Sequence, residues 1–196
     1  GLRVPARAIA TIDAAMTTAD RNDELADLIA RSQGENLGFA LLAGARDATP
    51  ADVAAIADDT AARVLWLDGL VVNVDRTAAN PNVLVRGGEA WMIDHGAALP
   101  FQYAWAAVTE ASPRRPTPAR APHLFADRAA RMRAIDDALA AALPRAVLEA
   151  AAARVPDALL AALTTAPTAD RLARMRAADV AFLWTRLTAP RPFVSA

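Results

Sequence analysis

Two neighbouring stretches decide the fold of this chain: NVDRTAANPNVLV at residues 73–85 and WMIDHGAAL at residues 91–99. The polar start of the first stretch predicts a loop, and its apolar end predicts a short strand over Val83–Val85. A second strand is expected over Ala90–Ile93, because the Gly-Gly pair between the two apolar runs favours a two-residue hairpin turn. A hairpin brings its ends together, so the residues that flank it are expected to be neighbours.

Three side chains in this block have the chemistry that phosphoryl transfer needs. Asp75 and Asn80 lie in the same loop, and Asp94 directly follows the hairpin. The reaction needs one carboxylate to orient or deprotonate the attacking hydroxyl, and a second carboxylate with a neutral oxygen ligand to hold Mg²⁺ against the phosphates. We therefore expect the three side chains to converge at one end of a small sheet. Gly96 is expected to let the backbone turn sharply behind Asp94.

This spacing resembles that of the protein-kinase-like superfamily. The run from Asn73 to Asp75, with Asn80 after it, is similar to the catalytic loop, and IDHG at residues 93–96 is similar to the Asp-Phe-Gly motif. The wider block most resembles the HipA-like kinases, a bacterial branch of that superfamily. The phosphatidylinositol 3- and 4-kinases have a similar loop and are the nearest competitor. The resemblance is sharp over residues 67–99 and weaker over residues 1–44.

The resemblance implies ATP and Mg²⁺ as cofactors and a protein Ser or Thr hydroxyl as the phosphoryl acceptor. It assigns Asp75 as the catalytic base, and Asn80 and Asp94 as the ligands of Mg²⁺ and so of the nucleotide. Asn73 is expected to support the loop by hydrogen bonds to its backbone. Arg76 is expected to contact a phosphate or an activation segment, or to form a structural salt bridge.

Other polar residues of this region have local interpretations. Asn82 is interpreted as the turn residue that leads into the following strand, and His95 as a packing residue rather than a catalytic one. Asp68 lies about one helical turn before the loop, so it is expected either to hydrogen-bond the loop backbone or to be solvated. Adenine is expected near the connection from Phe39 to Arg46, where no single residue is distinctive.

The chain departs from the superfamily in two respects. Superfamily members hold the α- and β-phosphates with a strand Lys paired to a helix Glu, whereas this chain contains no Lys and shows no Gly-rich loop before the block. Either most of the first lobe is missing from this chain, or the protein is a degenerate kinase. The intact loop favours a missing lobe, and this chain alone is then expected to bind ATP poorly and to be almost inactive.

Outside the block, the pattern predicts one α+β domain, mainly the helical C-terminal lobe of a protein-kinase-like fold with a few short strands. Residues 1–46 are interpreted as the end of the small lobe and the inter-lobe connection, and residues 47–196 as the helical lobe. The expected elements are strands over Val4–Ile12 and Phe39–Leu42, a helix over Asp23–Arg31, a helix capped by Thr49 from Pro50 toward Leu65, an irregular loop over Pro113–Pro122 and four helices after Ala126.

The amino-acid composition argues against several classes of function. The chain has 196 residues, 55% of them hydrophobic and 22% charged, so it can bury a core. Its net charge of -1 argues against a broadly basic nucleic-acid-binding surface. The absence of Cys excludes disulfides, thiolate zinc sites and cysteine nucleophiles. No apolar run is long enough for a transmembrane helix and no leader peptide is evident, so we expect a cytoplasmic protein without a membrane or nucleic-acid partner.

Two other functions stay open. A pseudokinase or partner-binding module, such as half of a toxin–antitoxin pair, is favoured by the absent Lys. A lipid or small-molecule kinase related to the phosphatidylinositol kinases is favoured only by the basic loop from Arg114 to Arg120. The sequence does not identify the acceptor.

Overall fold

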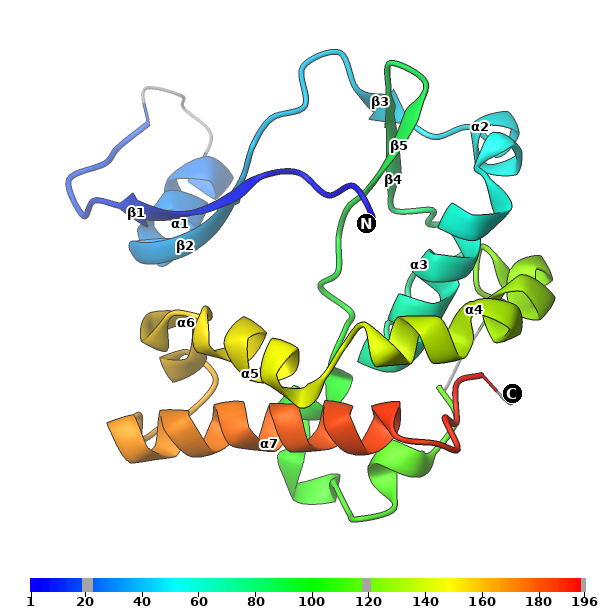
Figure 1. Cartoon of the computed structure of the whole chain (residues 1–196). Helices are drawn as coiled ribbons and strands as arrows, with labels where there is room; N and C mark the ends of the chain where they lie inside the picture. The colour runs from blue at the N-terminus through cyan, green and yellow to red at the C-terminus, as the bar shows by residue number, and fades with distance from the viewer. Residues whose placement is uncertain (19–22, 118–120, 195–196) are drawn as a thin grey trace.

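The computed structural model describes residues 1–18, 23–117 and 121–194, and Figure 1 shows the path of the chain. The described residues form an α+β fold in which helices predominate and two antiparallel sheets are small, as the sequence predicted. The strands are β1 (Arg7–Ile12), β2 (Gly34–Phe39), β3 (Arg46–Asp47), β4 (Val83–Arg86) and β5 (Glu89–Met92). The α-helices are α1 (Asp23–Arg31), α2 (Pro50–Ala55), α3 (Asp58–Val71), α4 (Ala129–Ala141), α5 (Arg145–Ala153), α6 (Asp157–Ala161) and α7 (Ala169–Leu187).

The N-terminal unit is the antiparallel pair β1–β2, with α1 in the connection between the strands. α1 has the predicted bounds, but the strand predicted over Phe39–Leu42 is wrong. β2 ends at Phe39, which pairs with Arg7, and Leu41 lies beyond the ladder with 92% of its surface exposed. The partner strand sets the limits of β2, and the apolar run that follows it does not. No residue of β1, α1 or β2 is buried.

The single helix predicted from Pro50 toward Leu65 is instead two helices. α2 begins with the predicted Thr49 cap, which is a capping box: the Thr49 hydroxyl accepts from the backbone N–H of Asp52, and the Asp52 carboxylate accepts from the Thr49 N–H at 2.8 Å. Ile56 then takes an extended conformation with ψ 127°, which ends α2. α3 starts afresh at Asp58, whose negative charge favours the positive end of a helix.

The second sheet has the order β3–β4–β5, and its β4–β5 hairpin confirms the prediction for this region. The turn residues Gly87 and Gly88 have φ values of 58° and 78°, which glycine adopts without strain. Val83 and Met92 face each other across the strands. Both are buried against Phe125 and the first turns of α3. The hairpin is thereby fixed to α3.

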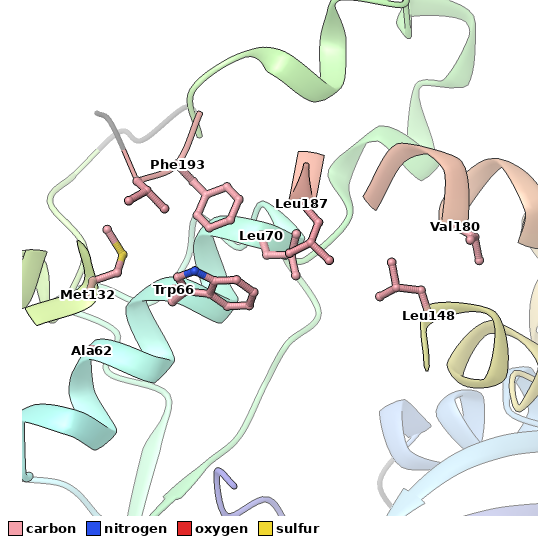
Figure 2. Close-up of a cluster of buried hydrophobic side chains, with 9 residues drawn as sticks. Ala62, Trp66, Leu70, Met132, Leu148, Val180, Leu187 and Phe193 are labelled. Carbon is pink, nitrogen blue, oxygen red and sulfur yellow. The ribbon is translucent and has the colours of Figure 1, made fainter. Parts of the chain in front are cut away.

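α3 is the centre of the helical part. Trp66 of α3 packs with Met132 of α4 and Phe193 near the C-terminus, and Leu70 joins the same cluster with Leu187 of α7, as Figure 2 shows. The Trp66 indole N–H donates to Asp136 at 2.7 Å, so its polar atom is satisfied. Leu148 of α5 and Val180 of α7 extend the same core cluster.

The end of α3 is covered by Arg186 of α7. This buried guanidinium donates to the Gly69 carbonyl through Nε at 3.0 Å, and to the Arg115 carbonyl at 2.7 Å. The last carbonyls of a helix lack partners within the helix and carry its negative dipole end, so a cation there is favourable. Burial lowers the pKa of Arg186 to about 10, which leaves it charged at neutral pH. The segment predicted as an irregular loop over Pro113–Pro122 is irregular where described, except for a short 3-10 turn at Ser112–Arg114.

Candidate functional site

The loop over residues 73–82 begins where α3 ends. Val72, the residue after the helix, has a left-handed conformation with φ 59°. The Asn73 N–H then donates back to the Asp68 carbonyl at 2.8 Å, and Asn73 Oδ1 accepts from the Asp75 N–H at 3.3 Å. Asn73 thus makes the contact with the loop backbone that its position predicted. The turn places Asp75 at a fixed distance beyond a well-packed helix.

Asp75 and Asn80 lie side by side. Asn80 Nδ2 donates to Asp75 Oδ2 at 2.7 Å, and Asn82 Nδ2 approaches the same oxygen at 3.4 Å. The loop is closed by two backbone hydrogen bonds between Thr77 and Asn80, at 3.0 and 3.2 Å. Asn82 was expected only to turn the chain into β4, but its side chain also belongs to this group.

The β4–β5 hairpin returns the chain to this loop. The Ile93 N–H donates to the Asn82 carbonyl at 3.1 Å, just beyond the last strand pair. Asp94 is the next residue, so it leaves the hairpin at the end where the loop enters it. The Asp94 side chain is exposed, and its Oδ1 accepts from the Gly96 N–H at 3.1 Å.

The sharp turn behind β5 is made by Asp94 itself. Asp94 has φ 46°, in the left-handed region, whereas Gly96 has no positive φ. The expectation that Gly96 supplies the freedom for this turn is therefore wrong. A Cβ at Gly96 would lie 3.1 Å from Asp94 Oδ1, so the absent side chain instead permits the close approach of the carboxylate.

Left-handed residues mark the boundaries of this block. Among the described residues, those other than glycine with positive φ are Val72, Asn82, Asp94 and Leu99. Each such conformation costs on the order of 1–3 kcal/mol and persists only where the surroundings enforce it. The β-branched Val72 has no local hydrogen bond of the Asn or Asp kind to offset this cost. Strain of this kind is concentrated at functional sites.

A buried ion pair lies beneath the loop. Arg76 Nε donates to Asp68 Oδ2 at 2.6 Å, and the two side chains are 0% and 1% exposed. Asp68 also accepts from Asn73 Nδ2 at 2.9 Å and from His123 Nε2 at 3.0 Å. Burial alone would raise the pKa of Asp68, but the His123 hydrogen bond and the charge and hydrogen bonds of Arg76 and Asn73 hold it below its usual value. Of the two roles expected for Arg76, the structure therefore has the salt bridge.

Arg76 reaches three further groups. Its Nη1 donates to the Asn82 carbonyl at 2.6 Å and to the Pro81 carbonyl at 3.2 Å. Its Nη2 lies 3.3 Å from His95 Nε2, which must accept because a guanidinium only donates. Burial and the Arg76 charge lower the pKa of His95, against the opposing charges of Asp68 and Asp94. His95 is therefore a neutral acceptor at pH 7.

A cavity of about 270 Å³ opens beside the loop. It joins the end of β3, the loop and the strand that precedes Asp94; its lining is Asp47, Ala48, Asn80, Pro81, Asn82, Val83 and Ile93. The connection from Phe39 to Arg46, where adenine was expected, leads directly into β3 and so into this wall.

The oxygen atoms of the site suit Mg²⁺. Within residues 1–18, 23–117 and 121–194, Asn80 Oδ1 and Asp94 Oδ2 accept no hydrogen bond. One carboxylate and one amide oxygen, completed by waters and phosphate oxygens, is a set that Mg²⁺ accepts. The described residues contain no group of three or more His, Cys, Asp or Glu arranged for a metal, and Mg²⁺ bound mainly through phosphates needs none.

Sequence reasoning missed the buried part of the site. Asp68 neither faces solvent nor bonds the loop backbone through its side chain; it has three side-chain partners. A carboxylate within the apolar run LWLDGLV was the available signal. His123 offered no local signal, because its partner Asp68 is 55 residues away in the sequence.

No family model matches the chain, and no curated protein and no solved structure matches it. No helix in the part of the chain that the structure describes is both long and apolar enough to cross a membrane.

Proposed function

We propose that this protein is an ATP- and Mg²⁺-dependent phosphotransferase that resembles the HipA-like kinases and acts on a Ser or Thr hydroxyl of a protein. The observation that carries the proposal is the meeting of the loop of Asp75 and Asn80 with the turn of Asp94. The two segments are joined at the open end of one hairpin, where the Ile93 N–H donates to the Asn82 carbonyl at 3.1 Å. The concentration of left-handed residues around the same segments supports it.

The residues divide the chemistry among them. Asp75 orients the acceptor hydroxyl and takes its proton, while the hydroxyl oxygen forms a bond to the γ-phosphorus of ATP and the bond to the β–γ bridging oxygen breaks, which releases ADP. Asn80 and Asp94 would hold Mg²⁺, which would neutralise phosphate charge at the site. Asn80 also donates to Asp75 at 2.7 Å, which fixes the base relative to the metal ligands. Catalysis of this kind depends on positioning and electrostatic stabilisation.

The N-terminal unit supports the interpretation that part of a small lobe is absent from this chain. β1 and β2 form a two-stranded sheet, which is marginally stable by itself. Its large apolar side chains Ile9, Leu37 and Phe39 are 42%, 49% and 61% exposed. Ile9 and Leu37 line the cavity between this unit and α5 and α6, so added strands would stabilise the unit by pairing with the edges of its sheet. They would also bring the phosphate-binding Lys and its Glu partner. Without them, this chain alone binds ATP weakly and transfers phosphate barely at all.

A second candidate is a pseudokinase or partner-binding module, for example one that binds an antitoxin-like protein. The absent Lys and the exposed apolar face of the β1–β2 unit favour it. A lipid or small-molecule kinase is less favoured. Arg114, from the basic loop that would serve a membrane, donates to the Thr188 carbonyl at 2.7 Å, and Arg120 lies outside the described residues. ATP as co-substrate implies a cytoplasmic location for the enzyme.

The test is calorimetric titration of Mg²⁺–ATP into this chain and into the chain extended upstream to its natural start. The extended form should bind, and Asp94→Ala should weaken that binding at least about 10-fold through loss of a metal ligand. Asp170→Ala is the matched control, because Asp170 is an exposed carboxylate on α7 that pairs with Arg174 on the same helix. If neither folded form binds, the phosphotransferase assignment is wrong and the partner-binding module remains.

A further inference from the structure

We propose that Arg76 is a positioning residue that couples the loop of residues 73–82 to the turn of residues 94–96. The proposal rests on the proposed function, since it takes these two segments as the halves of one Mg²⁺–ATP site. Neither segment has regular secondary structure, and each carries one of the two candidate metal ligands. Their relative position therefore depends on what joins them.

Asp75 and Arg76 are adjacent in the sequence, and their side chains lie on opposite sides of the loop. Asp75 is half-buried and hydrogen-bonds Asn80, on the side of the loop where Asn80 is exposed. Arg76 is wholly buried and points to α3. The loop is thus held from beneath by the residue next to its candidate base, so any displacement of the guanidinium displaces Asp75 as well.

The anchor for Arg76 is Asp68, on the last turns of α3. Asp68 is itself fixed by Asn73 at 2.9 Å and His123 at 3.0 Å. The tautomer of His123 follows from its contacts: Nδ1 accepts from the Phe125 N–H at 3.1 Å, so the proton lies on Nε2, toward Asp68. A carboxylate with three donors in the interior fixes its partner in direction as well as in charge.

From this anchor the planar guanidinium extends to both segments. Nη1 donates to the Asn82 carbonyl at 2.6 Å, and the same carbonyl accepts from the Ile93 N–H at 3.1 Å. Nη2 donates to His95 Nε2 at 3.3 Å, and His95 lies between Asp94 and Gly96. One rigid fork therefore contacts the end of the loop and the middle of the turn.

The link from Arg76 to His95 can be tested without disturbing the buried ion pair. His95 is half-buried, and His95→Gln keeps an acceptor for Arg76 Nη2, whereas His95→Leu removes it. The matched control is His123→Leu, which removes the histidine that is bonded to Asp68 but does not touch the turn. Because Asn73 and Arg76 still donate to Asp68 in this variant, its expected effect is a lower unfolding temperature without any local loosening at residues 94–96.

The first measurement needs no nucleotide: ¹⁵N relaxation order parameters of the backbone amides at residues 94–96 in the native protein. Wild type, His95→Gln and His123→Leu should stay near about 0.8, and His95→Leu should fall below about 0.7, because rigid and flexible backbone differ on this scale. A merely structural role would lower the unfolding temperature and leave these values unchanged.

The second measurement is Mg²⁺–ATP affinity of the upstream-extended chain. His95→Leu should weaken it about 10-fold or more, as loss of a residue that orients a metal ligand does, and His95→Gln should change it less than about threefold. Equal order parameters in His95→Leu and His95→Gln would overturn the coupling. In a third outcome, the order parameters differ between His95→Leu and His95→Gln as expected, but the wild-type extended chain does not bind Mg²⁺–ATP. The coupling then stands and the phosphotransferase assignment is wrong.

Discussion

Gly69 is the residue of α3 on which Phe193 of the C-terminal segment packs most closely. A Cβ at this position would lie 2.9 Å from both Cβ and Cδ2 of Phe193. Phe193 cannot move easily, because its ring meets Trp66 edge-on at 5.5 Å and lies under the Arg186 guanidinium at 5.3 Å. In a helix without such a neighbour, Gly→Ala would stabilise by about 1 kcal/mol. Here we expect Gly69→Ala to destabilise the protein by roughly 1–3 kcal/mol, as overpacking does.

Urea unfolding of a double-mutant cycle measures this effect. In the Phe193→Ala background the clash is absent, so Gly69→Ala should become neutral or stabilising there. Stabilisation by Gly69→Ala in the wild-type background would show that Phe193 does not pack on α3 as Figure 2 draws it.

Asp179 on α7 gives the protein a pH dependence of stability. Its Oδ2 accepts from Gln102 at 2.8 Å, but its buried Oδ1 has no partner among the described residues. Burial raises the pKa of Asp179, and the Gln102 hydrogen bond only partly opposes this. The folded state therefore holds a proton that the unfolded chain has already released. This contribution to stability is present below the unfolded pKa of about 3.9 and is lost as pH rises through the folded pKa.

Asp179→Asn should remove this dependence. The free energy of unfolding of wild type should fall, relative to the variant, by at most about 1.4 kcal/mol per pH unit above pH 4. Chemical unfolding of both proteins between pH 4 and 8 gives the difference, with Asp170→Asn on the exposed face of the same helix as the control. A constant difference across this range would mean that Asp179 is ionised normally.

At the same scale, the spacing of the polar block predicted the contact between Asp75 and Asn80 and not what supports it. Asp75 and Asn80 share a short loop, so their contact follows from local geometry. The role of Arg76 was ambiguous, because an arginine next to a candidate base can contact a phosphate at the surface or form a salt bridge in the interior. Its partners on α3 and the hairpin decide between the two, and that choice is tertiary.

α2 is an element whose stability depends on its ends. It has six residues and none is buried, so packing contributes little to it. Thr49 caps its N-terminus, and Arg46 on β3 holds Asp52 with two hydrogen bonds at 2.6 and 2.8 Å. We expect Thr49→Ala to lower the free energy of unfolding by about 1 kcal/mol, because it removes one half of the capping box.

The control for this prediction is Thr49→Ser, which retains the hydroxyl and should remain close to wild type. Thermal or urea unfolding distinguishes the two variants. Equal stability of the Ala and Ser variants would mean that the cap contributes nothing and that the Arg46–Asp52 pair alone holds α2 in place.

Helices and the glycine hairpin were predictable from sequence to the extent that their signals are local. α1 and the β4–β5 turn follow from periodicity and from the Gly87–Gly88 pair. The limits of β2 did not follow, because β1 defines them through pairing. The break before α3 did not follow either, since the Ala-rich run AAIADDTAA at residues 54–62 supports one helix as well as two and only the packing of α3 distinguishes them.

Across the whole molecule, stability is distributed unevenly. α3 is packed by β4–β5 on one side and by α4, α7 and the C-terminal segment on others, whereas Figure 1 shows β1, β2 and α1 beyond this core, near α6. A cavity of about 380 Å³ separates the unit from α5 and α6, lined on its two sides by residues such as Ile9 and Val155. A backbone hydrogen bond from the Met92 N–H to the Arg3 carbonyl, at 2.9 Å, attaches the chain to β5. Arg3 precedes β1, so this bond does not restrain the β1–β2 sheet itself.

We therefore expect amides of β1 and β2 to exchange with solvent at least about 100-fold faster than those of α3 and α7, because local opening there exposes almost no further apolar surface. Hydrogen exchange followed by mass spectrometry at neutral pH measures both groups in one sample. The upstream-extended chain is the matched comparison, since added strands that pair with the edges of the β1–β2 sheet should slow exchange in β1 and β2 and leave α3 unchanged. Equal protection of all four elements in this chain would mean that the β1–β2 unit is stable without further strands, which would remove the structural support for a missing part of the small lobe.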